Sequence, residues 1–172
     1  MKAVVERTQE DMEARDRGDR APLRWAALKG HLPVVQYLCE EGADKEAEDG
    51  YGKTPLHLVA EEGQLSVVQY MCEQGGDKEV DDGLGSAPLH WAASKGHLAL
   101  VQYLCKQGAH EEARDEDDMA PLYFAAYYGR LPVLQYLCKK GADKEARDDQ
   151  GMTPLHVAAE NGHIPVAQCL CE

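Results

Sequence analysis

The sequence has no apolar run near the ~20 residues that a membrane-spanning helix requires. Its first residues, MKAVVERTQEDME, are charged throughout and lack the apolar core of a secretory signal peptide. Positive charge is also scarce, since 18 Lys and Arg against 31 Asp and Glu give a formal net charge of −13. An acidic surface repels phosphate backbones. We therefore expect no membrane and no nucleic acid as partner, and a cytoplasmic protein, with the nucleus as the alternative.

Motifs for catalysis and cofactor binding are missing as well. The sequence contains no P-loop, no G-x-S-x-G and no G-x-G-x-x-G. Acidic pairs such as Asp81-Asp82 recur along the chain instead of forming one convergent pair, and residues 115–118 (DEDD) lack the spaced oxygen ligands and turn glycine of an EF-hand loop. The sequence therefore predicts a protein that is not an enzyme, with no catalytic, cofactor-binding or metal-binding residues.

The six cysteines indicate a repeat rather than a disulfide framework. Five of them lie 33 residues apart, namely Cys39, Cys72, Cys105, Cys138 and Cys171. A disulfide needs Cα atoms about 4.4–6.8 Å apart, whereas equivalent residues of stacked helices are separated by roughly 8–10 Å. We therefore expect free thiols, with Cys169 more exposed than the regular five.

A Pro-Leu pair recurs with the same period and marks the start of a short helix. The pairs begin at Pro22, Pro55, Pro88, Pro121 and Pro154. Proline fits the first helical turn, because its missing N–H has no acceptor there. Apolar residues at helical spacing follow, then a glycine, then a second helix. The polar connector GADKEAEDGYGK, rich in Asp and Gly, is typical of an extended finger with a tight turn.

A 33-residue period with T-P-L-H at the start of the first helix resembles the ankyrin-repeat family. The TPLH motif is intact at residues 54–57 and 153–156, and the resemblance extends from about Asp11 to the end. It implies an all-α repeat solenoid of ankyrin-type helix-turn-helix pairs with extended, β-hairpin-like finger loops. The expected units are an N-terminal stub or cap at 1–16, repeats at 17–49, 50–82, 83–115 and 116–148, and a truncated repeat at 149–172.

The resemblance also implies a structural role for the histidines. In this family the motif histidine (His57, His90 and His156 here) and the histidine after the first helix (His31, His97 and His163) bridge backbone groups of neighbouring turns. Their regular row, one per repeat, does not suit a metal site, because zinc ligands converge within about 2.0–2.3 Å of one ion. Tyr123 stands in the place of the motif histidine, so we expect a structural variant in which repeat four lacks one bridging imidazole.

Positions that differ between repeats are candidates for function. The resemblance implies that a protein or peptide docks on a concave face made of the finger tips and the exposed edge of the first helices. The candidate partner-binding residues on that face are Trp25, Lys29, Tyr51, Lys53, Glu61, Glu62, Trp91, Lys95, Met119, Phe124, Tyr127 and Tyr128. Trp25, Trp91 and Phe124 either pack between first helices or contact the partner, and both interpretations stay open.

Tyr127 and Tyr128 differ most clearly from the repeat pattern. Their counterparts are mostly polar: Leu28-Lys29, Glu61-Glu62, Ser94-Lys95 and Glu160-Asn161. Aromatic residues at exposed positions are enriched at binding hot spots. By contrast, Tyr37, Tyr70, Tyr103 and Tyr136 repeat regularly and are interpreted as packing residues. The groove is also predicted to be basic at repeat one and acidic at repeats four and five.

The sequence therefore predicts a non-catalytic protein-interaction scaffold. Two alternatives stay open, a targeting array cut from a longer enzyme or channel and a self-associating structural spacer. We expect a monomer, although end-to-end association through repeat five, by way of Val166 and Leu170, is a further hypothesis.

Overall fold

The computed structural model describes residues 11–18 and 20–172, and in these residues it contains ten helices and no strand. The predicted all-α repeat solenoid of helix pairs is confirmed. The first helices of the pairs are α2 (Pro22–Leu28), α4 (Pro55–Glu62), α6 (Pro88–Lys95), α8 (Pro121–Tyr127) and α10 (Pro154–Glu160). The second helices are α3 (Leu32–Glu40), α5 (Leu65–Glu73), α7 (Leu98–Lys106), α9 (Leu131–Lys140) and α11 (Ile164–Cys171).

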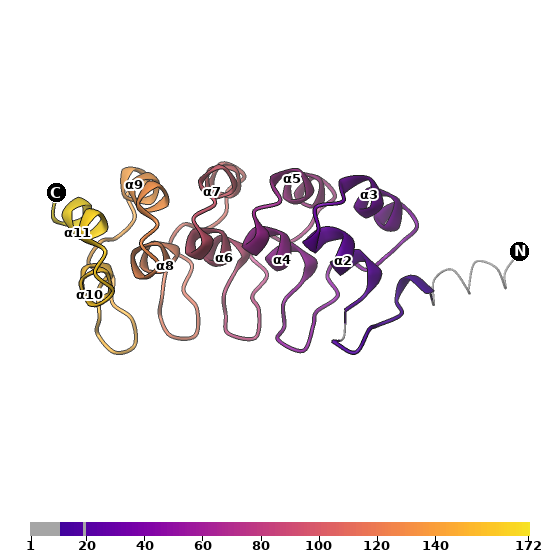
Figure 1. The fold of residues 1–172 in the computed structure, drawn as a ribbon, viewed down its shortest axis with the longest axis horizontal. Helices are drawn as coiled ribbons and strands as arrows, with labels where there is room; N and C mark the ends of the chain where they lie inside the picture. The colour runs from indigo at the N-terminus through magenta and orange to yellow at the C-terminus, as the bar shows by residue number, and fades with distance from the viewer. Residues whose placement is uncertain (1–10, 19) are drawn as a thin grey trace, which may run out of the picture.

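The helices form two parallel rows, with the loops between repeats extending from the row of first helices (Figure 1). Neighbouring first helices contact each other more closely than neighbouring second helices do. Small side chains permit this approach, because Ala27, Ala60, Ala93 and Ala126 are fully buried. A row packed more closely is shorter, so the array bends toward its first helices and places them on the concave side.

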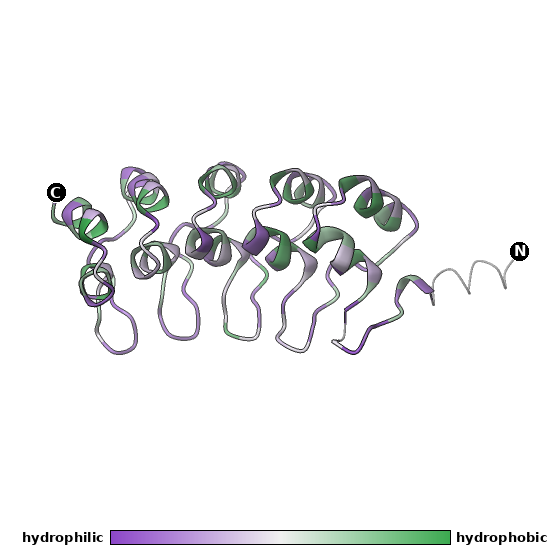
Figure 2. Cartoon of the chain, in the orientation of Figure 1, coloured by the Kyte–Doolittle hydropathy of each residue, from purple (hydrophilic) through white to green (hydrophobic). Residues whose placement is uncertain are grey.

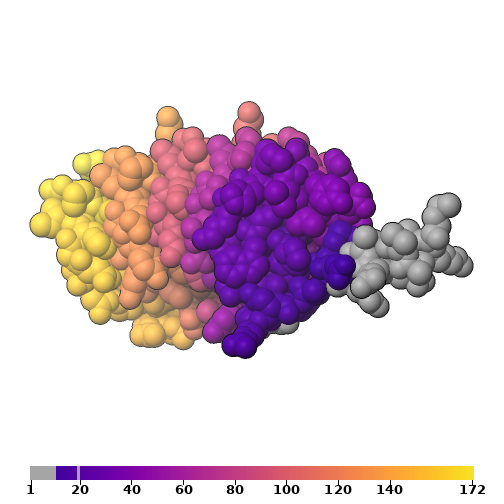
Figure 3. Space-filling view, turned by 45° about the vertical axis from the view of Figure 1, so that its right-hand side comes forward, coloured from indigo at the N-terminus to yellow at the C-terminus, as the bar shows by residue number. Residues whose placement is uncertain are grey.

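The core runs the length of the array as columns of equivalent residues. The leucine of each Pro-Leu pair is buried in repeats one to four, and Val35, Val68, Val101 and Leu134 are all fully buried. The apolar residues gather on the helices, which also carry polar positions, whereas the loops are mostly polar (Figure 2). Successive repeats form successive bands along the surface (Figure 3). Each repeat therefore completes its core by stacking on its neighbours, as in other solenoids.

Glycine is required where each first helix ends. Gly63 has φ +73°, a left-handed conformation that glycine adopts without a steric penalty. A Cβ at this position would lie 2.6 Å from Nδ1 of His97 in the next repeat. The close approach of the imidazole therefore adds a second reason for glycine at this position.

The fingers are turns organised by a recurring aspartate. In the finger at 49–53, Oδ1 of Asp49 accepts the backbone N–H groups of Tyr51 at 2.9 Å and Lys53 at 3.0 Å. The same pair of bonds recurs at Asp16, Asp82, Asp115 and Asp148. This aspartate column has the 33-residue period, yet the motif analysis did not single it out.

Neighbouring fingers are joined at their tips by backbone hydrogen bonds. The N–H of Gly83 donates to the carbonyl of Tyr51 at 2.8 Å, and that of Glu116 donates to the carbonyl of Leu84 at 3.0 Å. The N–H of Asp149 donates to the carbonyl of Asp117 at 3.0 Å. The finger tips therefore form a connected edge along the array instead of independent loops.

Two expectations about individual side chains were wrong. Cys169 is half-buried, and Cys171 is the exposed cysteine. Tyr37 is 59% exposed, whereas the other three tyrosines of its column pack partly against the core. All six thiols are free, as predicted.

The surface expected to mediate end-to-end association is also different. Val166 and Leu170 are buried against the preceding repeat, with exposed fractions of 1% and 7%, so they are not available at the surface of α11. Ile164, with an exposed fraction of 67%, is a large apolar side chain at the surface of α11.

Candidate partner-binding groove

Two buried imidazoles fasten the first helices to the fingers that follow them. Nδ1 of His57 accepts the N–H of Thr54 at 3.0 Å, so the ring donates through Nε2 to the carbonyl of Ser86 at 2.9 Å. His90 is held in the same way, with its Nε2 donating to the carbonyl of Ala113 at 3.0 Å. Burial lowers the pKa of both rings, which keeps them neutral in this arrangement. The bridging role implied by the family resemblance is confirmed for both.

A second set of side chains fixes the far end of each first helix. Nε2 of His97 bonds the carbonyl of Glu61 at 2.9 Å, and Nε2 of His163 bonds the carbonyl of Tyr127 at 3.0 Å. Arg130 takes the same role where the histidine is missing and donates to the carbonyl of Ser94 at 2.8 Å. These bonds hold in place the helix ends that carry the most variable groove positions.

Repeat four lacks the bridging imidazole, as expected from Tyr123, but the tyrosine supplies a bridge of its own. The Tyr123 hydroxyl donates to Oδ2 of Asp148 in the next finger at 2.5 Å, and the ring is buried. Burial, this hydrogen bond and the carboxylate charges of Asp148 and Glu160 raise the pKa of Tyr123. A phenol joined to a carboxylate therefore replaces an imidazole joined to a carbonyl.

In repeat one, an arginine occupies the position of the motif histidine. Arg24 is 1% exposed and pairs with the carboxylate of Asp49 at 2.6 Å. The guanidinium also donates to the carbonyl oxygens of Ala47 and Lys53. The second oxygen of the finger aspartate thus accepts a donor from the preceding first helix in repeats one and four.

Both tryptophans are held by the scaffold while keeping part of their rings in the groove. The indole N–H of Trp25 donates to Asp16 at 3.0 Å, and that of Trp91 donates to Asp82 at 2.9 Å. The Arg20 guanidinium lies 4.2 Å from the Trp25 ring centroid, and Nζ of Lys53 lies 3.2 Å from that of Trp91. Their ring faces are therefore covered by cations of the chain itself.

In repeats two and three, five of the predicted residues come together. Lys53 pairs with Glu61 at 2.8 Å, and Lys95 pairs with the same carboxylate at 3.2 Å. Although burial raises the pKa of Glu61, the two lysines lower it overall. Tyr51, which is 80% exposed, lines with Lys53 and Trp91 a hollow of about 600 Å³ between neighbouring fingers.

In repeat four, the remaining aromatic candidates line one small hollow. Met119, Tyr123, Phe124, Tyr127 and Tyr128 surround a volume of about 90 Å³, which we call the tyrosine hollow. The Tyr127 and Tyr128 rings meet edge to face with centroids 4.9 Å apart, and their exposed fractions are 41% and 46%. Phe124 is half-buried, and its ring packs edge to face with the His90 ring, with centroids 5.5 Å apart. Sequence reasoning did not include Tyr123 in this group.

Lys29 and Glu62 are exposed at the ends of α2 and α4 and line neither hollow. In residues 11–18 and 20–172, no group of three or more His, Cys, Asp or Glu side chains is arranged to hold a metal ion. The same residues contain no helix with the length and apolar character needed to cross a bilayer.

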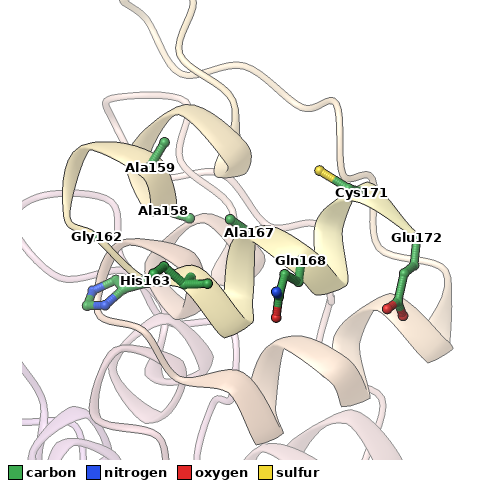
Figure 4. Close-up of a pocket in the computed structure, with 9 residues that line it drawn as sticks. Ala158, Ala159, Gly162, His163, Ala167, Gln168, Cys171 and Glu172 are labelled. Atoms are coloured by element: carbon green, nitrogen blue, oxygen red, sulfur yellow. The ribbon is translucent and has the colours of Figure 1, made fainter.

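A larger hollow, of about 750 Å³, lies away from the groove at the free face of α10 and α11 (Figure 4). Its lining is mostly apolar and includes Ala158, Ala159, Gly162 and the exposed Ile164. None of the predicted partner-binding residues reaches this surface. In the earlier repeats the corresponding face is covered by the repeat that follows.

The chain was also compared with known proteins. A family model described as ankyrin repeats (3 copies) matches residues 1–82, 23–115, 74–148 and 109–172, which together cover the whole chain. No curated protein matches it. The overlapping matches agree with the helix pairs, the 33-residue register and the imidazole bridges described above, and the chain therefore belongs to the ankyrin-repeat family.

Proposed function

We propose that the protein is a non-catalytic interaction scaffold that binds a protein or peptide on its concave face. Ankyrin repeats are in general protein–protein interaction modules. We choose the concave face because it presents the pair of exposed aromatic rings of Tyr127 and Tyr128. Neither ring belongs to the buried core, and the same positions are mostly polar in the other repeats.

The rest of the concave face supports a binding role. The fingers are joined tip to tip and the first helices are fixed by bridges such as that of His57, so the surface is held before a partner arrives. A preorganised surface loses less conformational entropy on binding. Tyr51 at 80% exposure adds a third aromatic side chain on the same side of the array.

We further propose the cytosol or the nucleus as the compartment. Six thiols without a disulfide suit a reducing environment, where disulfides are rare. A secreted domain with six cysteines would be expected to pair them.

The double change Tyr127→Ala and Tyr128→Ala tests the proposed face. Peptides selected from a random displayed library on the immobilised full chain serve as the ligands. Their affinities for the wild type and the variant are then measured by fluorescence anisotropy. We expect a loss of about tenfold or more, because truncating two central aromatic contacts typically costs more than 1 kcal/mol.

Tyr37→Ala is the control, because Tyr37 is an even more exposed tyrosine that lies on the second-helix row. It should leave affinity unchanged, and circular dichroism should show full helicity for both variants. Selected peptides that bind the double variant as tightly as the wild type would show that the concave face at repeat four is not the binding site.

A further inference from the structure

The groove contains three aromatic sites, and the chain supplies a cation to two of them. Arg20 lies over Trp25 and also pairs with Asp16 at 3.2 Å. Lys53 lies over Trp91 and also pairs with Glu61 at 2.8 Å. Each site therefore combines an aromatic face, a cation and a carboxylate. The cation is stabilised both by the ring and by the carboxylate.

The third site, the tyrosine hollow, has the aromatic face without the cation. Within residues 11–18 and 20–172, cations lie over Trp25, Trp91 and Tyr136, and none lies over a ring of this hollow. The repeat register explains the difference. Arg20 and Lys53 occupy equivalent positions 33 residues apart, and the next two residues of that column are Ser86 and Met119. Neither side chain can place a positive charge over Phe124.

Carboxylates remain around the hollow. Glu160 is the residue equivalent to Tyr127 in the next repeat, it is exposed, and α10 packs directly against α8. Besides burial, its negative charge and that of Asp148 raise the pKa of Tyr123, so both carboxylates lie within electrostatic reach of the hollow. The adjoining finger tip adds Glu116 and Asp117, both exposed. This end of the groove therefore favours a positive group.

From these observations we propose that the tyrosine hollow receives the guanidinium of an arginine side chain presented by the partner. The proposal rests on the proposed function, because it names the chemistry of the ligand at the same face. A planar guanidinium stacks on aromatic faces and is less strongly hydrated than an ammonium group, so it suits a small hollow walled by rings better than lysine does. Glu160, exposed on the neighbouring α10, is the carboxylate that would pair with it.

The test uses the ¹⁵N-labelled full chain and a minimal probe, N-acetyl-arginine amide, with N-acetyl-citrulline amide as the uncharged isostere. We expect the arginine probe to shift the backbone signals of residues 119–128 with a dissociation constant on the order of millimolar, and the citrulline probe to bind about tenfold more weakly. Equal shifts from both probes, or equal binding of N-acetyl-lysine amide, would overturn the proposal.

Three variants locate the site. Changing Tyr127 and Tyr128 to Leu keeps apolar bulk but removes the two exposed rings of the hollow, and should sharply reduce the preference for arginine over citrulline. Changing both to Phe keeps the rings and should retain the preference, which separates a loss of aromatic character from a loss of fold. Glu160→Gln should weaken arginine binding several-fold, whereas Glu73→Gln, at an exposed glutamate on the second-helix row of repeat two, should not.

The two proposals fail separately. Selected peptides that require Tyr127 and Tyr128 but contain no arginine would overturn the arginine assignment and leave the proposed function intact. An arginine probe that binds the hollow while no selected peptide depends on the tyrosines would overturn the proposed function instead.

Discussion

At the scale of single residues, Asp118 is unusual: among the residues that the structure describes, it is the one that is not glycine and has a positive φ, at +61°. The equivalent turn position is Gly52, Gly85 or Gly151 in three other fingers, with φ between +72° and +78°. An L-residue in this conformation brings its Cβ close to the following carbonyl, at a cost that glycine avoids. Finger four therefore carries a local strain that these three fingers do not.

Asp118→Gly should stabilise the protein by about 0.5–1 kcal/mol, since relief of the left-handed strain exceeds the entropy lost by glycine. Denaturant unfolding followed by circular dichroism measures the change. Gly52→Ala is the opposite case, because its Cβ would lie 2.5 Å from the backbone nitrogen of Gly83, and it should destabilise. A neutral or destabilising Asp118→Gly would contradict this account.

At the scale of elements, the bridges between first helices and fingers determine how one repeat holds the next. His57 spans 29 residues to reach the carbonyl of Ser86, which is itself buried. Because burial lowers the pKa of His57, the unfolded chain binds a proton more readily than the folded one below the ordinary pKa of about 6.5. This contribution to stability is present above pH 6.5 and is lost as the pH falls below it.

His57→Asn should therefore destabilise most at neutral pH. Asparagine can still accept from Thr54 but cannot reach Ser86, so the expected loss at pH 7.5 is about 1–3 kcal/mol. The gap between wild type and variant in free energy of unfolding should narrow at pH 5.5, as measured by urea unfolding. His156→Asn should cost less at pH 7.5, because among the described residues His156 hydrogen-bonds Thr153 of its own repeat and no finger of another. A gap that widens on acidification would show that the bridge is not a neutral imidazole.

Most of the elements could be predicted from sequence, because a 33-residue period repeats the same helix, turn and finger chemistry five times. The bridging partners could be predicted only where the motif histidine is present. Tyr123 and Arg24 replace the motif histidine in repeats four and one. From the sequence motif alone, the hydrogen-bond partner of the replacing side chain could not be predicted. Their target, the finger aspartate, could have been found, since Asp49 and Asp148 belong to a column with the same period.

The candidate site was predictable to a similar extent. Comparing repeats identified Tyr127 and Tyr128 as exceptions to the pattern, and both are exposed. The same comparison left open whether Trp25 and Trp91 pack or contact a partner, because the indole hydrogen bonds to Asp16 and Asp82 depend on how each finger folds back on its helix.

At the scale of the whole molecule, the net charge of −13 acts against compaction. Acidic side chains occur in every repeat, with seven each in repeats one and two, so like charges on neighbouring repeats repel one another. At low ionic strength this repulsion extends about 30 Å, whereas near 0.15 M salt it extends about 8 Å.

Raising sodium chloride from about 10 mM to about 150 mM should therefore raise the melting temperature by a few degrees. Salt also screens attractions such as Lys53–Glu61, but that pair is partly buried and is less affected. Choline chloride at equal ionic strength should produce the same rise, since the effect depends on screening. A melting temperature that falls with salt would mean that ion pairs outweigh the repulsion.

The tip-to-tip bonds between fingers have a consequence for how such a chain can change in length. Each bond joins equivalent atoms of neighbouring units, from Tyr51 to Gly83, from Leu84 to Glu116 and from Asp117 to Asp149. An in-frame duplication or loss of one whole unit would therefore recreate the same bond at the new junction. The groove could be lengthened, shortened or reordered by recombination, with each unit bringing its own contact residues and leaving the joints unaltered.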